Sequence, residues 1–164
     1  RGRRFLNLFA YTGVATVRVA LDGAQATTTV DMSPTYLDWA RRNLELNDLR
    51  GCELVRADCL EWLAQKRRER YGVIFLDPPT FSNSKRMDRD FDVQRDHVEL
   101  IERAAALLDE DGVLIFSNNY RRFRMDRDRL AGLVLEDITR QTIPTDFERR
   151  PKIHNCWKIT RAPS

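Results

Sequence analysis

The chain has 164 residues, a formal net charge of +3 and an apolar fraction of 42%. This size and composition suit one folded domain with one hydrophobic core and exclude a disordered segment. The longest apolar runs, such as residues 73–76, are far shorter than the roughly 20 residues that cross a membrane as a helix. We therefore expect residues 1–164 to form a single domain outside the membrane. The chain starts without Met and directly with a predicted strand, which indicates a domain cut from a longer polypeptide.

The cysteines and histidines point to a reduced compartment. Cys52, Cys59 and Cys156 are odd in number and include no C-x-x-C pair, and His97 and His154 lie far apart in the chain. This spacing favours neither a disulfide framework nor a zinc site. We predict a cytoplasmic protein without a metal.

Strand and helix patterns alternate along the first half of the chain. Residues 5–9 form a short apolar run, and Gly23 is placed to stop the helix that follows. The β-branched residues before Asp31 favour a second strand, and Ser33 with Pro34 makes a typical helix start. The predicted elements are strands at 5–9, 25–30, 52–56 and 71–76 and helices at 14–21, 34–49 and 60–66.

The second half continues the alternation after a long polar loop at 82–97. Its charged residues balance to zero, and a loop of that length is uncommon unless it is functional or disordered. The predicted elements are helices at 98–108 and 130–138 and strands at 113–116, 141–143 and 154–159. Repeated strand–helix–strand units at this spacing predict an α/β fold, with a mainly parallel sheet covered by helices on both faces.

Acidic residues follow two of the predicted strands, where ligands of such sheets bind. Asp31 lies about 20 residues after the turn that contains Gly13, a spacing at which a carboxylate accepts both hydroxyls of a ribose. Asp58 follows the third strand and is suited to accept from an exocyclic amine such as that of adenine. Each also has a plain structural interpretation, because Gly13 fits an ordinary turn and both carboxylates fit helix caps.

The fourth strand ends in the sequence Asp77-Pro78-Pro79-Thr80-Phe81, the sharpest signal in the chain. Two prolines fix φ and remove two N–H donors, so the loop is stiff and its carbonyls are free to accept from a substrate. The aromatic ring that follows is suited to stack on a flat base. The alternative is a rigid turn that closes the sheet.

These residues resemble the class I S-adenosylmethionine-dependent methyltransferases. The loop at 77–81 is similar to their proline-proline-aromatic signature, with one residue inserted before the aromatic. The resemblance implies a Rossmann-like, seven-stranded sheet with an antiparallel last strand, and S-adenosylmethionine as cofactor. The glycine-rich first motif of that class is reduced here to Gly13 after Asn7. The cofactor-binding residues implied are Phe9, Tyr11, Thr12, Gly13, Asp31, Met32, Asp58, Cys59 and Asp77.

Longer segments resemble the C-terminal half of the bifunctional bacterial methyltransferases of large-subunit ribosomal RNA. These segments are residues 6–13, 77–87, 116–119 and 153–157. The resemblance implies methyl transfer to N7 of a guanine of large-subunit ribosomal RNA. It also implies that this chain is the C-terminal part of a protein whose N-terminal half carries a second methyltransferase and an RNA-binding module.

The chemistry of this transfer assigns roles around the proline loop. Guanine N7 carries a lone pair and no proton, so no general base is needed and positioning dominates. Asp77 and the carbonyls of Pro78 and Pro79 orient the base and favour its developing positive charge, and Phe81 stacks on it. Cytosine C5 methylation would need a cysteine nucleophile, and residues 78–80 and 117–119 contain none. Transfer to an exocyclic amine and a catalytically silent RNA- or partner-docking domain remain as alternatives.

Basic residues near the predicted site are candidate RNA contacts. Residues 120–124 alternate arginines with aromatics after the fifth strand, which is a plausible RNA-contacting pattern. A solvated surface loop is the alternative, and the excess of arginine over lysine also fits a GC-rich genome. The predicted substrate-binding residues are Lys85, Arg86, Asn118, Arg121, Arg122 and Arg124.

Overall fold

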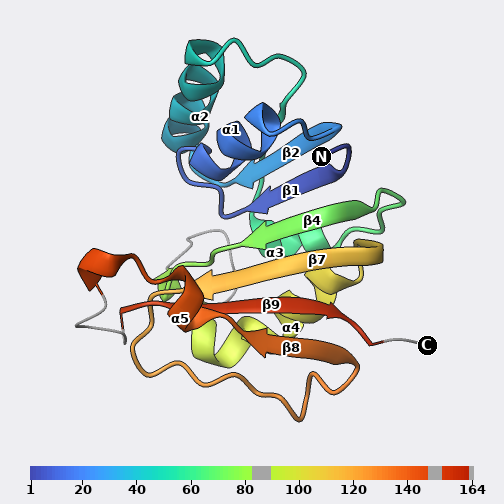
Figure 1. The fold of residues 1–164 in the computed structure, drawn as a ribbon, viewed down its shortest axis with the longest axis vertical. Helices are drawn as coiled ribbons and strands as arrows, with labels where there is room; N and C mark the ends of the chain where they lie inside the picture. Colours follow the sequence, from blue (N-terminus) through green and yellow to red (C-terminus); the bar gives the residue numbers. More distant parts are fainter. Residues whose placement is uncertain (83–89, 148–152, 163–164) are drawn as a thin grey trace.

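A computed structural model describes residues 1–82, 90–147 and 153–162 of the chain. Its main sheet has seven strands: β1 (Arg4–Leu8), β2 (Ala26–Asp31), β3 (Glu53–Arg56), β4 (Tyr71–Leu76), β7 (Leu108–Asn118), β8 (Leu133–Asp137) and β9 (Asn155–Arg161). Their spatial order is β3-β2-β1-β4-β7-β9-β8 (Figure 1). The first five strands in this order run parallel, whereas β9 is antiparallel to both β7 and β8. The expected seven-stranded sheet with an antiparallel last strand is confirmed.

The remaining elements are shorter. The helices are α1 (Val14–Leu21), α2 (Pro34–Leu46), α3 (Cys59–Ala64), α4 (Val93–Ala105), the single turn α5 (Thr139–Thr142) and a 3-10 turn at Thr145–Phe147. Two short strands, β5 (Phe81–Ser82) and β6 (Phe91–Asp92), form a separate antiparallel pair between β4 and α4.

Alternation of side chains along β1 explains why helices cover both faces of the sheet. Leu6 and Leu8 are fully buried in a core that also contains side chains of α3 and α4. Asn7 points to the opposite face, where its amide donates to the Thr16 hydroxyl of α1 at 3.0 Å. Thr16 in turn lies 2.7 Å from the hydroxyl of Thr29 on β2. One face of the sheet is thus covered by apolar packing, and on the other face a row of buried hydrogen bonds holds α1 in place.

Two predicted elements near the C-terminus are wrong. The helix expected at 130–138 is the edge strand β8, in which Leu133 and Leu135 pack against the core while Val134 is 47% exposed. This period of two is typical of a strand with one buried face. The strand expected at 141–143 is instead the end of α5, a turn that begins where Asp137 accepts a hydrogen bond from Thr139 N–H at 2.9 Å.

The predicted loop at 82–97 is too long. Of this segment, residues 83–89 lie outside the described residues, and the rest contains β6 and the first turn of α4. Asp92 caps α4, since its carboxylate accepts from the N–H of Arg95 at 3.0 Å. The dense charges of this segment mask the helix start in the sequence.

None of the described helices is both long enough and apolar enough to cross a bilayer.

Gly13, the N-cap of α1, packs closely against Ala40 of α2. Its φ of +70° is left-handed, and an added Cβ would lie 2.7 Å from the Cβ of Ala40. We therefore expect Gly13→Ala to lower the free energy of unfolding by roughly 2–4 kcal/mol, through backbone strain and overpacking together. Gly51→Ala is the matched control, because Gly51 has a φ of +75° and open space around it. It should lose only about 1–2 kcal/mol in the same urea titration. Equal losses would contradict the close packing of α1 on α2.

Candidate active site

A cavity of about 680 Å³ opens beyond the C-terminal ends of β1, β2, β3 and β4. It brings together Asp31, Asp58 and Asp77, which follow three different strands of the sheet. The lining residues are Phe9, Tyr11, Asp31, Met32, Ser33, Pro34, Tyr36, Asp58, Cys59, Leu60, Asp77, Pro78, Pro79, Thr80, Ser82, Phe91 and Asn119. The three carboxylates expected from the strand ends therefore share one cavity.

Asp31 is the last residue of β2 and organises the loops on both sides of it. One carboxylate oxygen accepts from the N–H of Tyr11 at 2.9 Å, and the other accepts from the N–H of Ser33 at 2.8 Å. The hydroxyl of Ser33 caps α2 instead, accepting from Tyr36 N–H at 3.3 Å. Asp31 is thus oriented by backbone donors, and each oxygen keeps a second lone pair for a ligand.

Asp58 is the N-cap of α3. One of its oxygens accepts from the N–H groups of Leu60 at 2.8 Å and Glu61 at 3.2 Å. The second oxygen has no protein hydrogen-bond partner among the described residues, although Asp58 lines the cavity. The cap expected from sequence and a ligand contact are therefore compatible, because they use different oxygens.

The loop between β1 and α1 holds three residues in left-handed backbone conformations. Phe9 has a φ of +56° and Tyr11 of +52°, which is uncommon for residues with a side chain. Gly13, with φ +70°, completes the loop. The N–H of Phe9 donates to the sulfur of Cys59 at 3.2 Å, and the amide of Asn43 donates to Thr12 O at 2.9 Å. Hydrogen bonds from surrounding elements therefore maintain a shape that this class of fold usually obtains with glycines.

Cys59 has a structural role in this arrangement. Its thiol is 2% exposed, and its sulfur lies 3.7 Å from Val30 O, to which it donates. Burial raises the pKa of Cys59 well above its ordinary value, and burial likewise raises the pKa of Cys156. Both side chains are therefore neutral thiols at neutral pH and not activated nucleophiles.

Asp77 directly follows β4, and its partly buried side chain faces the neighbouring strand β7. The hydroxyl of Ser117 donates to its carboxylate at 2.6 Å. Burial raises the pKa of Asp77 above its ordinary value, while the Ser117 hydrogen bond and the nearby His154 oppose that rise. Ser117 is a positioning residue for Asp77 that the sequence analysis missed, because 40 residues separate the two.

The rest of the proline loop divides between the cavity and solvent. Pro78, Pro79 and Thr80 line the cavity, whereas Phe81, predicted to stack on the substrate, is 54% exposed and is not among the lining residues. The aromatic ring that does line this wall is Phe91, which is 2% exposed and lies 5.9 Å from the ring of Phe9. Phe91 follows a charged segment, and no pattern in the sequence marks it.

Asn118, at the end of β7, is a predicted substrate contact, but the adjacent Asn119 is the residue that lines the cavity. Asn118 is fully buried, and its amide oxygen accepts from Tyr120 N–H at 3.0 Å and from the Asn155 amide at 3.1 Å. The adjacent Asn119 is exposed and lines the cavity. Asn119, the first residue after β7, therefore faces the cavity, whereas Asn118 is held in the interior by its two hydrogen bonds.

The predicted basic contacts fall into two groups. Arg121, Arg122 and Arg124 are exposed, and none has an ion pair with an acidic residue in the described part of the chain. Lys85 and Arg86 lie outside the described residues.

Of the other predicted cofactor contacts, Thr12 and Gly13 do not line the cavity and instead help to shape the loop.

Within residues 1–82, 90–147 and 153–162, no group of three His, Cys, Asp or Glu side chains is arranged to hold a metal ion. The cavity also contains Tyr36 and Leu60, which sequence reasoning missed. Their only signal is that they follow Asp31 and Asp58 closely in the chain.

The sequence and the fold both match known proteins. Residues 1–136 match a family model described as conserved hypothetical protein 95. The chain is 61% identical over 163 residues to the ribosomal RNA large subunit methyltransferase K/L of Methylococcus capsulatus, covering 97% of this chain and 22% of that protein. It is 56% identical over 164 residues to the protein of the same name from Vibrio cholerae, covering 98% of this chain and 23% of that protein. The chain thus spans less than a quarter of the length of these curated relatives.

Solved structures confirm the fold class. SMU.776, provisionally described as a methyltransferase and crystallised with SAH, superposes with a TM-score of 0.81 at 26% identity. This match covers 96% of this chain and 45% of that one. A SAM-dependent methyltransferase from Agrobacterium tumefaciens has a TM-score of 0.77 at 20% identity, covering 98% of this chain and 56% of that one, and shows the fold alone.

The raised pKa of Asp77 predicts that its charge destabilises the fold. A carboxyl whose pKa is higher in the folded state favours folding when protonated, and this advantage is lost as pH rises through the folded pKa. At pH 7 we therefore expect Asp77→Asn to keep or raise the free energy of unfolding, by about 1.4 kcal/mol for each pKa unit of the rise. Urea unfolding at pH 7 and at pH 4 measures this difference. A variant that is less stable than the parent at pH 7 would show that the Ser117 contact outweighs burial.

Proposed function

For a chain that belongs to the family described as conserved hypothetical protein 95, we propose the function of an S-adenosylmethionine-dependent methyltransferase domain acting on large-subunit ribosomal RNA. The proposed target atom is N7 of a guanine. The observation that carries the proposal is one cavity containing Asp31, Asp58 and the rigid loop that begins at Asp77. The curated relatives and the structure crystallised with SAH support the same chemistry.

The residues around the cavity fit S-adenosylmethionine. Asp31 presents a carboxylate, oriented by two backbone donors, to the hydroxyls of a ribose. Asp58 has an oxygen available for the amine of adenine, and Met32 and Leu60 provide apolar walls nearby. The volume of about 680 Å³ lies within the usual range for small-molecule sites. When bound, this cofactor supplies an electrophilic methyl group on a sulfonium.

The proline loop is suited to hold the target base. Among the described residues, no backbone hydrogen bond occupies the carbonyls of Pro78 or Pro79, so both remain available as acceptors. Asp77 is fixed by Ser117 at the same wall, and methylation at N7 makes the purine positively charged. A carboxylate held in a partly buried site favours such a charge more than one in water. The ring of Phe91, which is almost fully buried in the core, supports this side of the cavity from behind.

Transfer to N7 agrees with the side chains at the cavity. N7 loses no proton on methylation, so this transfer needs none of the lining side chains to act as a base. The neutral, buried thiols of Cys59 and Cys156 do not support the covalent addition that cytosine C5 methylation needs. Transfer to an exocyclic amine would instead place the methyl group on guanine N2 or adenine N6.

RNA and the remainder of a longer protein are the proposed partners. The exposed arginines Arg121, Arg122 and Arg124 follow β7 next to the cavity residue Asn119, at a place where they can meet phosphates. We further propose that this domain belongs to the C-terminal half of a longer, cytoplasmic protein. In it, the N-terminal half carries a second methyltransferase and an RNA-binding module. The much greater length of the curated relatives supports a longer protein.

Asp77→Ala tests the enzyme proposal. We expect the rate of methyl transfer from labelled S-adenosylmethionine to a large-subunit ribosomal RNA transcript to fall roughly 100-fold, since a preorganised charge at the reacting base is lost. RNA affinity should remain within about twofold, and Asp22→Ala, an exposed aspartate at the end of α1, is the matched control. Mass analysis of the digested RNA locates the methyl group.

Each outcome of this experiment is informative. Label in 7-methylguanosine supports the N7 assignment, whereas label on an exocyclic amine overturns it and leaves the methyltransferase proposal intact. Equal transfer by Asp77→Ala and the parent would overturn the assigned role of Asp77. No transfer by any form, with RNA binding retained, would favour the docking domain.

Asp58→Asn tests the cofactor contact separately from stability. Asparagine is as good an N-cap as aspartate, so α3 should remain intact. Replacing a carboxylate oxygen by an amide removes an acceptor, and we expect the affinity for S-adenosylhomocysteine to fall about 10-fold by calorimetry. Unchanged affinity together with an unchanged melting temperature would exclude Asp58 from the site.

A further inference from the structure

Gln94, in the first turn of α4, is bonded to the main chain of the arginine-rich segment at 120–124. Its side-chain N–H donates to the carbonyl of Arg124 at 2.9 Å. Its side-chain oxygen accepts from the N–H of the same residue at 2.8 Å. The two bonds close a ring between one amide side chain and one residue 30 positions away, so they fix both the position and the orientation of Arg124.

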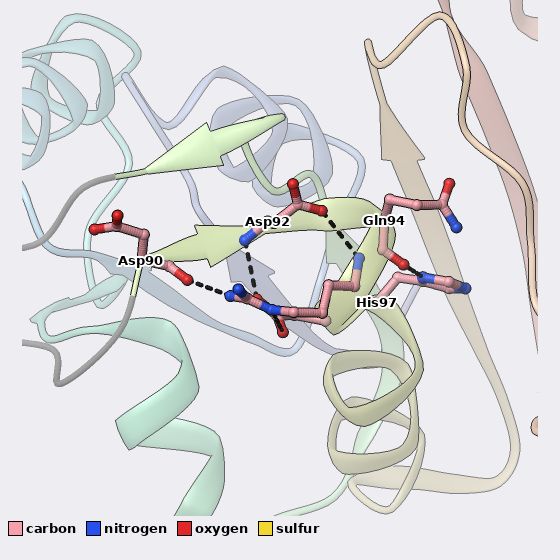
Figure 2. Close-up of polar contacts among 6 residues, drawn as sticks. Asp90, Asp92, Gln94 and His97 are labelled. Carbon is pink, nitrogen blue, oxygen red and sulfur yellow. Dashed lines mark hydrogen bonds and ion pairs between the residues drawn. The ribbon is translucent and has the colours of Figure 1, made fainter.

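His97, one helical turn further on, holds the same segment. Its Nδ1 lies 2.9 Å from the carbonyl of Gln94, and its Nε2 accepts from the N–H of Asp126 at 3.1 Å. Figure 2 shows the contact of the ring with Gln94. The ring of Phe123 meets His97 edge-on at 4.9 Å between centroids. Burial lowers the pKa of His97, which agrees with the neutral tautomer that these two bonds require.

The same turn of α4 is fixed to the wall of the cavity. The N–H of Val93 donates to the carbonyl of Thr80 at 3.1 Å, and Thr80 lines the cavity. The carboxylate of Asp96 accepts from the N–H of Asp92 at 2.9 Å and from the guanidinium of Arg95, a network drawn in Figure 2. Gln94 is therefore part of a rigid turn whose position is set by the loop that follows Asp77.

The arginine side chains of the segment are left available by this arrangement. The bonds that Gln94 makes to Arg124 and that His97 makes to Asp126 involve only main-chain atoms of those two residues. Arg121, Arg122 and Arg124 are exposed and lie within four consecutive positions of the chain, so an anchor that uses only main-chain atoms leaves their charges free to meet phosphates.

We propose that Gln94 is a positioning residue that holds Arg121, Arg122 and Arg124 at a fixed place relative to the cavity, where they bind the RNA phosphate backbone. The inference rests on the proposed function. It adds that recognition of the phosphates depends on an uncharged side chain that does not itself contact RNA. Since phosphate contacts position a nucleic acid without reading its sequence, the anchor sets which nucleotide reaches the proline loop.

A double-mutant cycle in the full-length protein tests whether Gln94 anchors the arginines. We expect Gln94→Ala to raise the KM for a large-subunit ribosomal RNA transcript roughly 5- to 10-fold, with kcat within about twofold and the affinity for S-adenosylhomocysteine unchanged. The combined change Arg121→Ala, Arg122→Ala and Arg124→Ala should raise KM more and flatten the salt dependence of RNA binding. Added to that triple variant, Gln94→Ala should have no further effect. Gln25→Ala, at the opposite end of the sheet, is the matched control and should behave as the parent.

The outcomes separate the inference from the function on which it rests. If Gln94→Ala raises KM equally with and without the arginines, Gln94 does not act through them and the inference is overturned. A parental KM for Gln94→Ala beside a raised KM for the triple variant overturns the anchor alone. An unchanged KM for the triple variant overturns the RNA surface itself. Should Gln94→Ala fold poorly by thermal unfolding, Gln94→Glu serves instead. It keeps the acceptor for Arg124 N–H, loses the donor, and is expected to raise KM in the same direction.

Discussion

The parallel pairing of β1 with β2 on one side and β4 on the other is the constraint on which the site depends. Leu8 pairs with Val30 of β2 and with Leu76 of β4, so the three strands end at the same level. The residues that follow these pairs are Phe9, Asp31 and Asp77, and all three face one cavity. The residues that directly follow these strands therefore lie at one edge of the sheet, although the strands are far apart in the chain.

Several features of this edge oppose folding. Phe9 and Tyr11 hold left-handed backbone conformations, each at a cost of order 1–3 kcal/mol, and the partial burial of Asp77 raises its pKa because it disfavours the charged form. The apolar face of the sheet, which α3 and α4 cover, is where the chain buries most of its large side chains. In Figure 1 these two helices lie behind the strands. Stability is therefore concentrated away from the edge where the loops are shaped for a ligand.

Hydrogen bonds from neighbouring elements substitute for local conformational preference around the cavity. Asp31 supports Tyr11, the sulfur of Cys59 supports Phe9, and Gln94 supports Arg124. In each pair the supporting side chain comes from another element. The shape of the ligand-facing loops is thus a property of the assembled sheet and of the helices that pack on it.

The sequence by itself determined the fold class and the identity of the three carboxylates. Apolar runs such as 71–76 mark buried strands, and polar residues directly after them must lie at the ligand-binding edge of a parallel sheet. The sequence did not reveal that residues 130–138 contain an edge strand, because Leu130, Leu133, Val134 and Ile138 also recur at helical spacing.

Only the tertiary structure decided which residues complete the site. Phe91 and Asn119 line the cavity whereas Phe81 and Asn118 do not, and Ser117 is paired with Asp77. These choices depend on which face of a strand meets the cavity and on contacts across 30 to 40 residues of chain. Local patterns report the period of burial along one element, whereas the partners of a side chain are set by how the elements pack.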